Sequence, residues 1–345
     1  IITFIFSLGG AVFGMSEESV PFVAILVPLM LALGYDSIMA VGVTYLACAL
    51  GFSSAMLNPF TVGIAQSIAE IPMFSGIEYR TIIWFITTTV GTLFLMMYAT
   101  KIKKNPEFSP VYESDKIKRE NLTNFGEDKD GFTFTHKIIL SLLALCIGII
   151  VWGVLTQGFW IPQIAAVFLV TGLASGIIGR LSGDEMADAF IEGAKGMIGA
   201  AIMIGFARAI VIIAENASII DTILYNLAGV IGKLPPLLAA CIMYPIQMFI
   251  NFFVGSGSGQ AALTMPILAP LGDLIGISRQ LTVLIFQFGD GFSNVIFPTS
   301  GILIACLGIA GVPFGKWLKW VMPLQGILFV LAITFITIGS LIGWA

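Results

Sequence analysis

The sequence predicts an all-α polytopic membrane protein with two inverted repeats, and three observations support this prediction. Hydrophobic residues make up 58% of the chain and charged residues only 10%, with a mean hydropathy of +1.01. A soluble domain carries about 25% charged residues. Apolar stretches recur along nearly the whole chain, and a set of interrupted apolar segments occurs twice in the same order. The lipid bilayer is therefore the first predicted partner.

The chain begins at Ile1 inside an apolar stretch, without an initiator methionine, a basic region or a cleavage site. We interpret this as a missing N-terminus rather than a signal peptide. The 4 cysteines stand singly in apolar runs, which does not indicate a disulfide framework or a zinc site. The net charge of -4 and the lack of a basic patch give no sign of a nucleic-acid partner.

The first repeat is predicted over residues 1–100. It opens with a re-entrant helical hairpin over residues 1–34, whose two apolar arms flank the polar tip at 14–19. Neither arm is comfortably long enough to cross about 30 Å of hydrocarbon. Irregular backbone at membrane depth is tolerated only inside protein or beside a water-filled cavity. A broken helix is predicted over residues 37–69, and a complete span over 81–100.

Residues 101–137 form the long polar stretch and are predicted to be a cytoplasmic loop. This stretch holds eight of the 16 Lys and Arg residues. Cytoplasmic segments carry such an excess of positive residues, and the rule counts positive residues rather than net charge. Its 7 carboxylates, counted along the sequence, therefore do not change the assignment.

The second repeat is predicted over residues 138–345. It contains ordinary spans at 138–156, 161–178 and 197–213, a hairpin at 237–276 with its tip at 255–260, a broken helix at 279–311, and a last span at 321–342. Pro28 and Gly34 align with Pro270 and Gly276 at an offset of 242 residues. We interpret this correspondence as an internal duplication.

Paired interrupted segments in two related halves are the best sequence indication of a transporter's binding site. Where a helix breaks, the N–H groups of one half-helix and the C=O groups of the other become available to a ligand. An anion would bind at the N-terminal ends and a coupling cation at the carbonyl ends. Ser, Thr and Asn at such breaks add compact polar partners.

Several motifs resemble the anaerobic four-carbon dicarboxylate carrier family, and within it the YfcC-type branch of basic amino-acid antiporters. They are Gly9-Gly10-Ala11-Val12-Phe13-Gly14-Met15-Ser16-Glu17-Glu18, Leu33-Gly34-Tyr35-Asp36, Gly51-Phe52-Ser53-Ser54, Asn58-Pro59-Phe60-Thr61, Gly205-Phe206-Ala207-Arg208, Asp221-Thr222-Ile223-Leu224, Gly255-Ser256-Gly257-Ser258-Gly259 and Gly289-Asp290-Gly291-Phe292-Ser293-Asn294. The resemblance covers all of the chain except the polar stretch. It implies inverted repeats, an elevator-like homodimer and a place in the bacterial inner membrane, and the family's opening helices are absent here.

The resemblance also implies where solute and ion bind. The predicted site residues are Ser16, Glu17, Glu18, Ser19, Ser53, Ser54, Asn58, Thr61, Ser256, Ser258, Gln260, Asp290, Ser293, Asn294, Thr299 and Ser300. A coupling Na⁺ is assigned to Asp290, Asn294 and Ser53, with H⁺ as the other coupling ion. No further cofactor is expected.

The charged candidates have structural alternatives. Glu17 and Glu18 would bind the solute or the coupling ion, because a carboxylate at membrane depth has a high free-energy cost and is usually functional. In the structural alternative, both residues occupy the first turn of a helix that Ser16 caps. Asp290 would bind a cation or a proton, or cap the following half-helix. Arg208 would hold a substrate carboxylate or, slightly favoured, neutralise Glu215.

Two further segments indicate membrane interfaces rather than sites. Residues 184–195 carry charges at helical spacing with apolar residues between them, which predicts an interfacial amphipathic helix. Lys316, Trp317, Lys319 and Trp320 resemble an anchor in the headgroup region.

The predicted function is secondary active transport of a small charged organic solute by antiport or ion-coupled symport. The acidic candidates favour a basic or zwitterionic amino acid, with a four-carbon dicarboxylate as the alternative. An intramembrane protease is disfavoured because the only histidine is in the polar stretch. A channel is disfavoured because the chain has no repeated filter sequence. No phosphate-binding Gly-x-x-x-x-Gly-Lys-Ser/Thr loop is present, so the energy source is expected to be a gradient or exchange.

Overall fold

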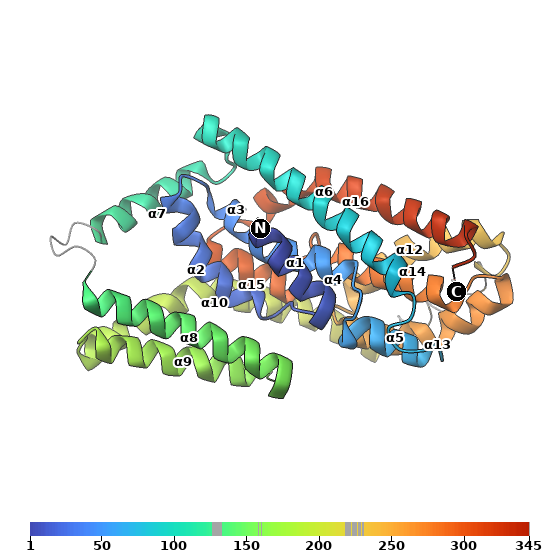
Figure 1. The fold of residues 1–345 in the computed structure, drawn as a ribbon, viewed down its shortest axis with the longest axis horizontal. Helices are drawn as coiled ribbons and strands as arrows, with labels where there is room; N and C mark the ends of the chain where they lie inside the picture. Colours follow the sequence, from blue (N-terminus) through green and yellow to red (C-terminus); the bar gives the residue numbers. More distant parts are fainter. Residues whose placement is uncertain are drawn as a thin grey trace. The chain divides into compact units, whose positions relative to one another are not determined.

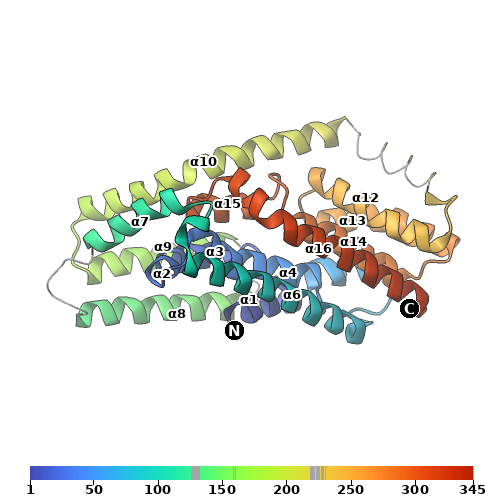
Figure 2. The ribbon, with the colours of Figure 1, turned by 90° about the horizontal axis from the view of Figure 1, so that it is seen from above.

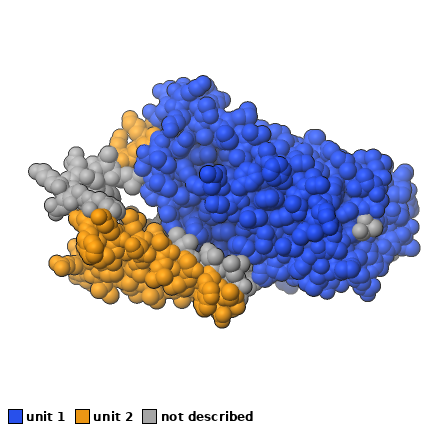
Figure 3. Space-filling model, viewed as in Figure 1, with its two compact units in different colours: residues 1–112, 199–345 blue, residues 113–198 orange. Residues whose placement is uncertain are grey.

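The computed structural model describes residues 1–125, 133–157, 159, 161–217, 222, 226, 229 and 231–344. Every regular element among these residues is a helix, which confirms the all-α class (Figure 1). The chain divides into two compact units, coloured separately in Figure 3. Unit 1 contains Ile1–Tyr112 and Gly199–Ala345, and unit 2 contains Glu113–Ile198.

The first part of unit 1 contains a helix–turn–helix pair, a broken helix and a long helix. The pair is α1 (Ile2–Phe13) and α2 (Ser19–Ala32). The broken helix runs through α3 (Ser37–Val41), the π-helical turn η1 (Gly42–Leu46) and α4 (Ala47–Ser53), and resumes as η2 (Pro59–Gly63) and α5 (Ile64–Ile68). The long helix is α6 (Ile77–Lys104).

The last part of unit 1 has the same order of elements. A helix–turn–helix pair is formed by α12 (Pro236–Phe253) and α13 (Gly257–Ile275). The broken helix is α14 (Arg279–Ser293) followed by α15 (Gly301–Ala310). The long helix α16 (Phe314–Leu341) then packs against α6.

The polar stretch is largely helical rather than irregular. After α6 come the short helix η3 (Pro106–Phe108) and α7 (Tyr112–Phe125), and α8 (Phe134–Gln157) starts inside the stretch. Within unit 2, α8 packs on α9 (Ile161–Ile178). The helix α10 (Gly183–Asn216) contributes residues to both units. The described part of residues 184–194 is exposed apart from half-buried Met186, and shows no apolar face packed on protein. The cytoplasmic side of the stretch stays a prediction.

Matching residues in the two halves begin and end matching helices. Gly34 after α2 and Gly276 after α13 both adopt left-handed backbone, with φ of 82° and 80°. Glycine does so without the steric cost that other residues carry. Asp36 then caps α3 by accepting from Met39 N at 2.8 Å, and Ser278 caps α14 by accepting from Leu281 N at 3.2 Å. The sequence offset of 242 thus corresponds to equivalent turns.

Among the described residues, three helices are long and apolar enough to cross a membrane: α6, α12 and α16. The spans predicted at 81–100 and 321–342 fall in α6 and α16. The first arm of the second predicted hairpin, α12, also has the length and hydropathy of a span and contains Pro245. The re-entrant course of this hairpin stays a prediction.

Helices of the two halves pack against one another, and α4, α14 and α16 lie side by side (Figure 2). The first arm of each pair packs on the broken helix of its own half, α1 on α4 and α12 on α14. The second arm packs on the broken helices of both halves, α2 on α3 and α15 and α13 on α14 and α5, and α4 also packs on α14. A Cβ atom at Gly51 would lie 1.8 Å from Ser7 O, so the α1–α4 contact requires glycine.

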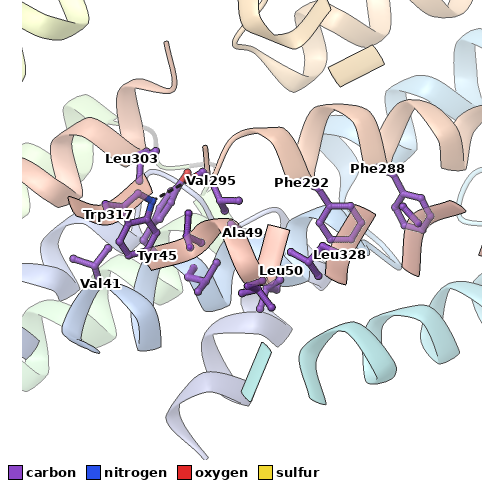
Figure 4. Close-up of a cluster of buried hydrophobic side chains, with 14 of the residues drawn as sticks. Val41, Tyr45, Ala49, Leu50, Phe288, Phe292, Val295, Leu303, Trp317 and Leu328 are labelled. Atoms are coloured by element: carbon purple, nitrogen blue, oxygen red, sulfur yellow. Dashed lines mark hydrogen bonds between the residues drawn. The ribbon is translucent and has the colours of Figure 1, made fainter. Parts of the chain in front are cut away.

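A large apolar core joins these helices (Figure 4). Phe288 and Phe292 of α14 stack at 5.2 Å within it. Trp317 is fully buried, and its Nε1 donates to Val295 O at 2.9 Å. Trp320 is also buried, so the interface-anchor prediction is wrong for both tryptophans. Lys316 and Lys319 are exposed, and only the lysines keep that assignment.

Candidate functional site

The tip of the second helix pair meets the breaks of both broken helices. A Cβ atom placed on Gly257 would lie 2.6 Å from Thr61 Cγ2 and 2.8 Å from Asp290 Oδ2. Thr61 belongs to the first broken helix and Asp290 to the second. Gly257 is the first residue of α13, so the start of this helix lies against both polar side chains.

Asp290 is completely buried and lies inside α14 rather than at a helix start. The capping alternative is therefore wrong for this residue. Neither carboxylate oxygen has a hydrogen-bond partner of ordinary geometry, and Asn294 is its polar neighbour. A buried carboxylate without compensation is costly. The position therefore favours a bound cation or proton.

Asn251 of α12 holds the end of α14. Its Nδ2 lies 3.0 Å from Asp290 O, 2.7 Å from Ser293 Oγ and 3.0 Å from Asn294 Oδ1. Its own Oδ1 is buried without a partner. Sequence reasoning missed Asn251 because it lies inside an apolar run, although a lone amide in such a run could have drawn attention to it.

Tyr45 connects the first broken helix to the second break. Its hydroxyl donates to Asn294 O at 2.9 Å and lies 3.4 Å from Ser300 Oγ. Tyr45 is in the π-helical turn η1 and is buried. This residue was also missed, because a tyrosine within an apolar helix carries no local signal of a contact across 249 residues of sequence.

The first break carries unused polar groups. Asn58 caps η2 by accepting from Phe60 N at 2.9 Å, which leaves its buried Nδ2 without a partner. The buried Thr61 hydroxyl also has none. The N–H groups of Met56 and Leu57 both donate to Ala11 O at 3.0 Å, so the first helix pair fixes this break.

The serines at the breaks donate their hydroxyl protons to their own helices. Ser53 Oγ donates to Ala49 O at 2.5 Å and Ser54 Oγ to Leu50 O at 2.6 Å. Ser293 Oγ donates to Gly289 O at 2.6 Å. Such bonds are common for serine within helices. These hydroxyls keep lone pairs for a cation, but their protons are used.

Hydrogen bonds of a serine and of two glutamine side chains stabilise the second tip. Ser256 caps α13 by accepting from Gly259 N at 3.3 Å, and its hydroxyl lies 3.4 Å from Ser258 Oγ. Gln260 Nε2 donates to Gln247 Oε1 at 2.8 Å. Gln247 is a further residue that the sequence did not indicate. The predicted Thr299 lies beside this tip, its carbonyl oxygen 3.4 Å from the position of a Cβ on Gly255.

The first tip lies directly before α2. The helix α2 begins at Ser19, so Ser16, Glu17 and Glu18 precede it, and the alternative that placed both Glu residues in its first turn is wrong. Glu18 accepts from Ser16 N at 3.1 Å. Ser19 Oγ donates to Ser16 O at 2.6 Å and lies 4.0 Å from Cys306 Sγ. The side chains of Arg208 and Glu215 lie outside the described residues.

The described site places a carboxylate beside a helix start. The carboxylate of Asp290 faces the start of α13, where backbone N–H groups and the helix dipole attract a negative group. No cluster of three or more His, Cys, Asp or Glu side chains occurs in the described parts. A coupling Na⁺ would use oxygen ligands, including the predicted Asp290, Asn294 and Ser53.

A family model described as "C4-dicarboxylate anaerobic carrier" matches residues 1–341. The chain belongs to this family. The family consists of carriers and not enzymes, so the chain is a membrane transporter rather than a protease.

Curated relatives agree with this assignment. Over 351 aligned residues the chain is 47% identical to "Putative basic amino acid antiporter YfcC" of Escherichia coli, with 99% of this chain and 69% of the relative covered. It is 36% identical to an uncharacterized protein of Haemophilus influenzae, with 94% of this chain and 64% of the relative covered. The chain thus spans about two thirds of the length of each.

A solved structure shares the fold. The YdaH transporter of Alcanivorax borkumensis matches with a TM-score of 0.54 at 17% identity, with 99% of this chain and 78% of that chain covered. This likeness supports the all-α fold.

Proposed function

We propose that this chain forms the greater part of a secondary active transporter for a basic or zwitterionic amino acid. The observation that carries the proposal is the completely buried carboxylate of Asp290, which has no ion-pair partner among the described residues and lies beside the N-terminal end of α13. A cationic group of the solute would neutralise the carboxylate. The helix end would receive the solute carboxylate.

A four-carbon dicarboxylate is the second candidate, and the description of the family supports it. Such a solute needs cationic or N–H partners at both of its ends. No ion pair with Asp290 is formed by a described lysine or arginine. Two carboxylates would therefore bind beside an unneutralised third, which disfavours the dicarboxylate unless a coupling cation binds with it.

The transport cycle would use the contact between the second tip and the two breaks. In this structure the tip lies directly against Thr61 and Asp290, so solute entry requires the tip to move away. We propose that H⁺, Na⁺ or a second solute drives this movement in an elevator-like cycle. The homodimer, the bacterial inner membrane and the cytoplasmic side of residues 101–137 belong to the same proposal. Glu17 and Glu18 would meet the solute on its way.

Uptake into liposomes tests the solute assignment. Purified full-length protein should exchange or accumulate labelled arginine, ornithine or lysine more readily than succinate. The pH and Na⁺ gradients are varied independently to identify the coupling ion. A clear preference for succinate would overturn the amino-acid assignment and establish the dicarboxylate.

A further inference from the structure

A groove lies at the C-terminal end of α6, away from the transport site. It has a volume of about 380 Å³ and is lined by Tyr35, Met96, Ala99, Thr100, Lys103 and Lys104. The α6 members follow the i, i+3, i+4, i+7, i+8 spacing of one helix face. Tyr35, which follows α2, forms the opposite side. The groove is therefore built from two segments of unit 1.

The polarity of the groove changes along its length. Met96 is exposed, neighbouring Met97 is exposed as well, and Leu93 continues the exposed apolar surface toward the middle of the helix. Thr100 donates its hydroxyl proton to Met96 O at 2.8 Å, which leaves its methyl group for the wall. Lys103 and Lys104 form the other end. An apolar wall that ends in two cations matches an amphiphile with an anionic head.

At the lysine end of the groove, the side chain of Lys103 is held by a contact with Tyr35. Lys103 Nζ lies 5.1 Å from the centre of the Tyr35 ring, within range of a cation–π interaction. Neither Lys103 nor Lys104 forms an ion pair with any described carboxylate. The positive end of the groove therefore lacks a protein counter-ion in the described part.

We propose that this groove binds one anionic phospholipid, with its phosphate at Lys103 and Lys104 and an acyl chain along Met96. A small soluble anion would use the lysines but would gain nothing from the apolar wall. Lysines at the end of a membrane helix lie at the depth of the headgroups, where anionic lipids attract them. This proposal does not depend on which solute is transported.

The bound lipid would also stabilise the start of the first broken helix. Asp36 follows Tyr35 directly and caps α3, and it accepts hydrogen bonds from Tyr98 of α6 and from Ser109 Oγ, the latter at 2.6 Å. A headgroup held between Tyr35 and Lys103 would add a contact between these same segments. Lipid occupancy should therefore raise the thermal stability of the protein.

The experiment measures lipid binding to purified full-length protein by native mass spectrometry. Phosphatidylglycerol and phosphatidylcholine are offered in equal amounts, and inorganic phosphate is added in a separate arm. The double variant Lys103→Gln/Lys104→Gln is compared with Lys316→Gln/Lys319→Gln. The control lysines are exposed at the start of α16, which packs antiparallel to α6 through Trp320 and Tyr98 at 5.1 Å.

The wild type should bind phosphatidylglycerol preferentially, and the groove variant should lose about tenfold in affinity while the control pair retains it. Phosphatidylglycerol should also raise the melting temperature of the wild type but not of the groove variant. Equal losses in both variants would show general surface attraction and would overturn the proposal. Absence of a preference in the wild type, or displacement of the lipid by inorganic phosphate, would also overturn it.

Discussion

Asp290 is the residue on which the proposed chemistry depends. It is completely buried, lies within a helix, and neither of its oxygens has a hydrogen-bond partner of ordinary geometry. A structural role would normally give a buried carboxylate such partners. The buried negative charge therefore requires a cation or a proton. In a transporter, the solute or the coupling ion would provide it.

Replacing Asp290 by Asn should abolish coupled uptake, by at least about 100-fold, because the amide cannot neutralise a cation. Membrane insertion and elution as a single species should be unchanged. Labelled-arginine uptake into liposomes gives the measurement. Asp273→Asn is the matched control, since that exposed carboxylate forms a surface ion pair with Arg279 at 2.9 Å, and it should transport normally. Normal uptake by Asp290→Asn would remove Asp290 from the site.

Gly257 should tolerate no side chain. A Cβ there would press on Thr61 and Asp290 at 2.6 and 2.8 Å, so Gly257→Ala should reduce uptake strongly. The control is Gly255→Ala, where the nearest atom, Thr299 O, would be at 3.4 Å. Equal uptake by the two variants would contradict the close approach of the tip.

At the scale of elements, the helix breaks and the helix–turn–helix pairs could be predicted from the sequence, because glycine, serine and proline interrupt the apolar runs there. Such residues act locally, so their effect can be read along the chain. Asn251, Gln247 and Tyr45 were not predictable, because their partners lie on other elements. Ser53 and Ser54 instead make local bonds, donating to carbonyls one turn earlier in the same helix.

The hydrogen bond from Tyr45 to Asn294 O should stabilise the second break. Tyr45→Phe would leave that carbonyl unpaired and should lower the free energy of unfolding by about 1–2 kcal/mol. Tyr244→Phe is the matched control, since the buried Tyr244 hydroxyl has no partner. Chemical denaturation in detergent gives both values, and equal destabilisation would contradict the assigned role.

The α1–α4 contact should depend on Gly51. A Cβ there would overlap Ser7 O at 1.8 Å, and this oxygen belongs to the backbone and cannot turn away, so Gly51→Ala should cost about 3 kcal/mol or more. Gly315→Ala, with no atom within 4 Å, should be neutral. The yield of monodisperse protein and its melting temperature give the comparison. Unchanged stability of Gly51→Ala would contradict this packing.

At the scale of the whole molecule, the two halves are interdependent. Each second arm packs on the broken helix of the other half, and the central polar groups come from both halves. The sequence predicted the two halves from repeated Pro and Gly positions. It did not predict that each second arm also packs on the broken helix of the other half, because that contact joins distant segments. Nor did it predict the helical character of residues 112–125, because a charged segment carries little apolar periodicity.

The central claim is that the two breaks form one solute site that opens to each side of the membrane in turn. Thr61→Cys, in a protein whose four native cysteines are replaced, tests this directly with a membrane-impermeant thiol reagent. Thr61 is buried in this structure, so labelling reports opening. We expect labelling from both sides, suppressed by arginine. Labelling from one side only, or labelling that solute does not change, would contradict the account.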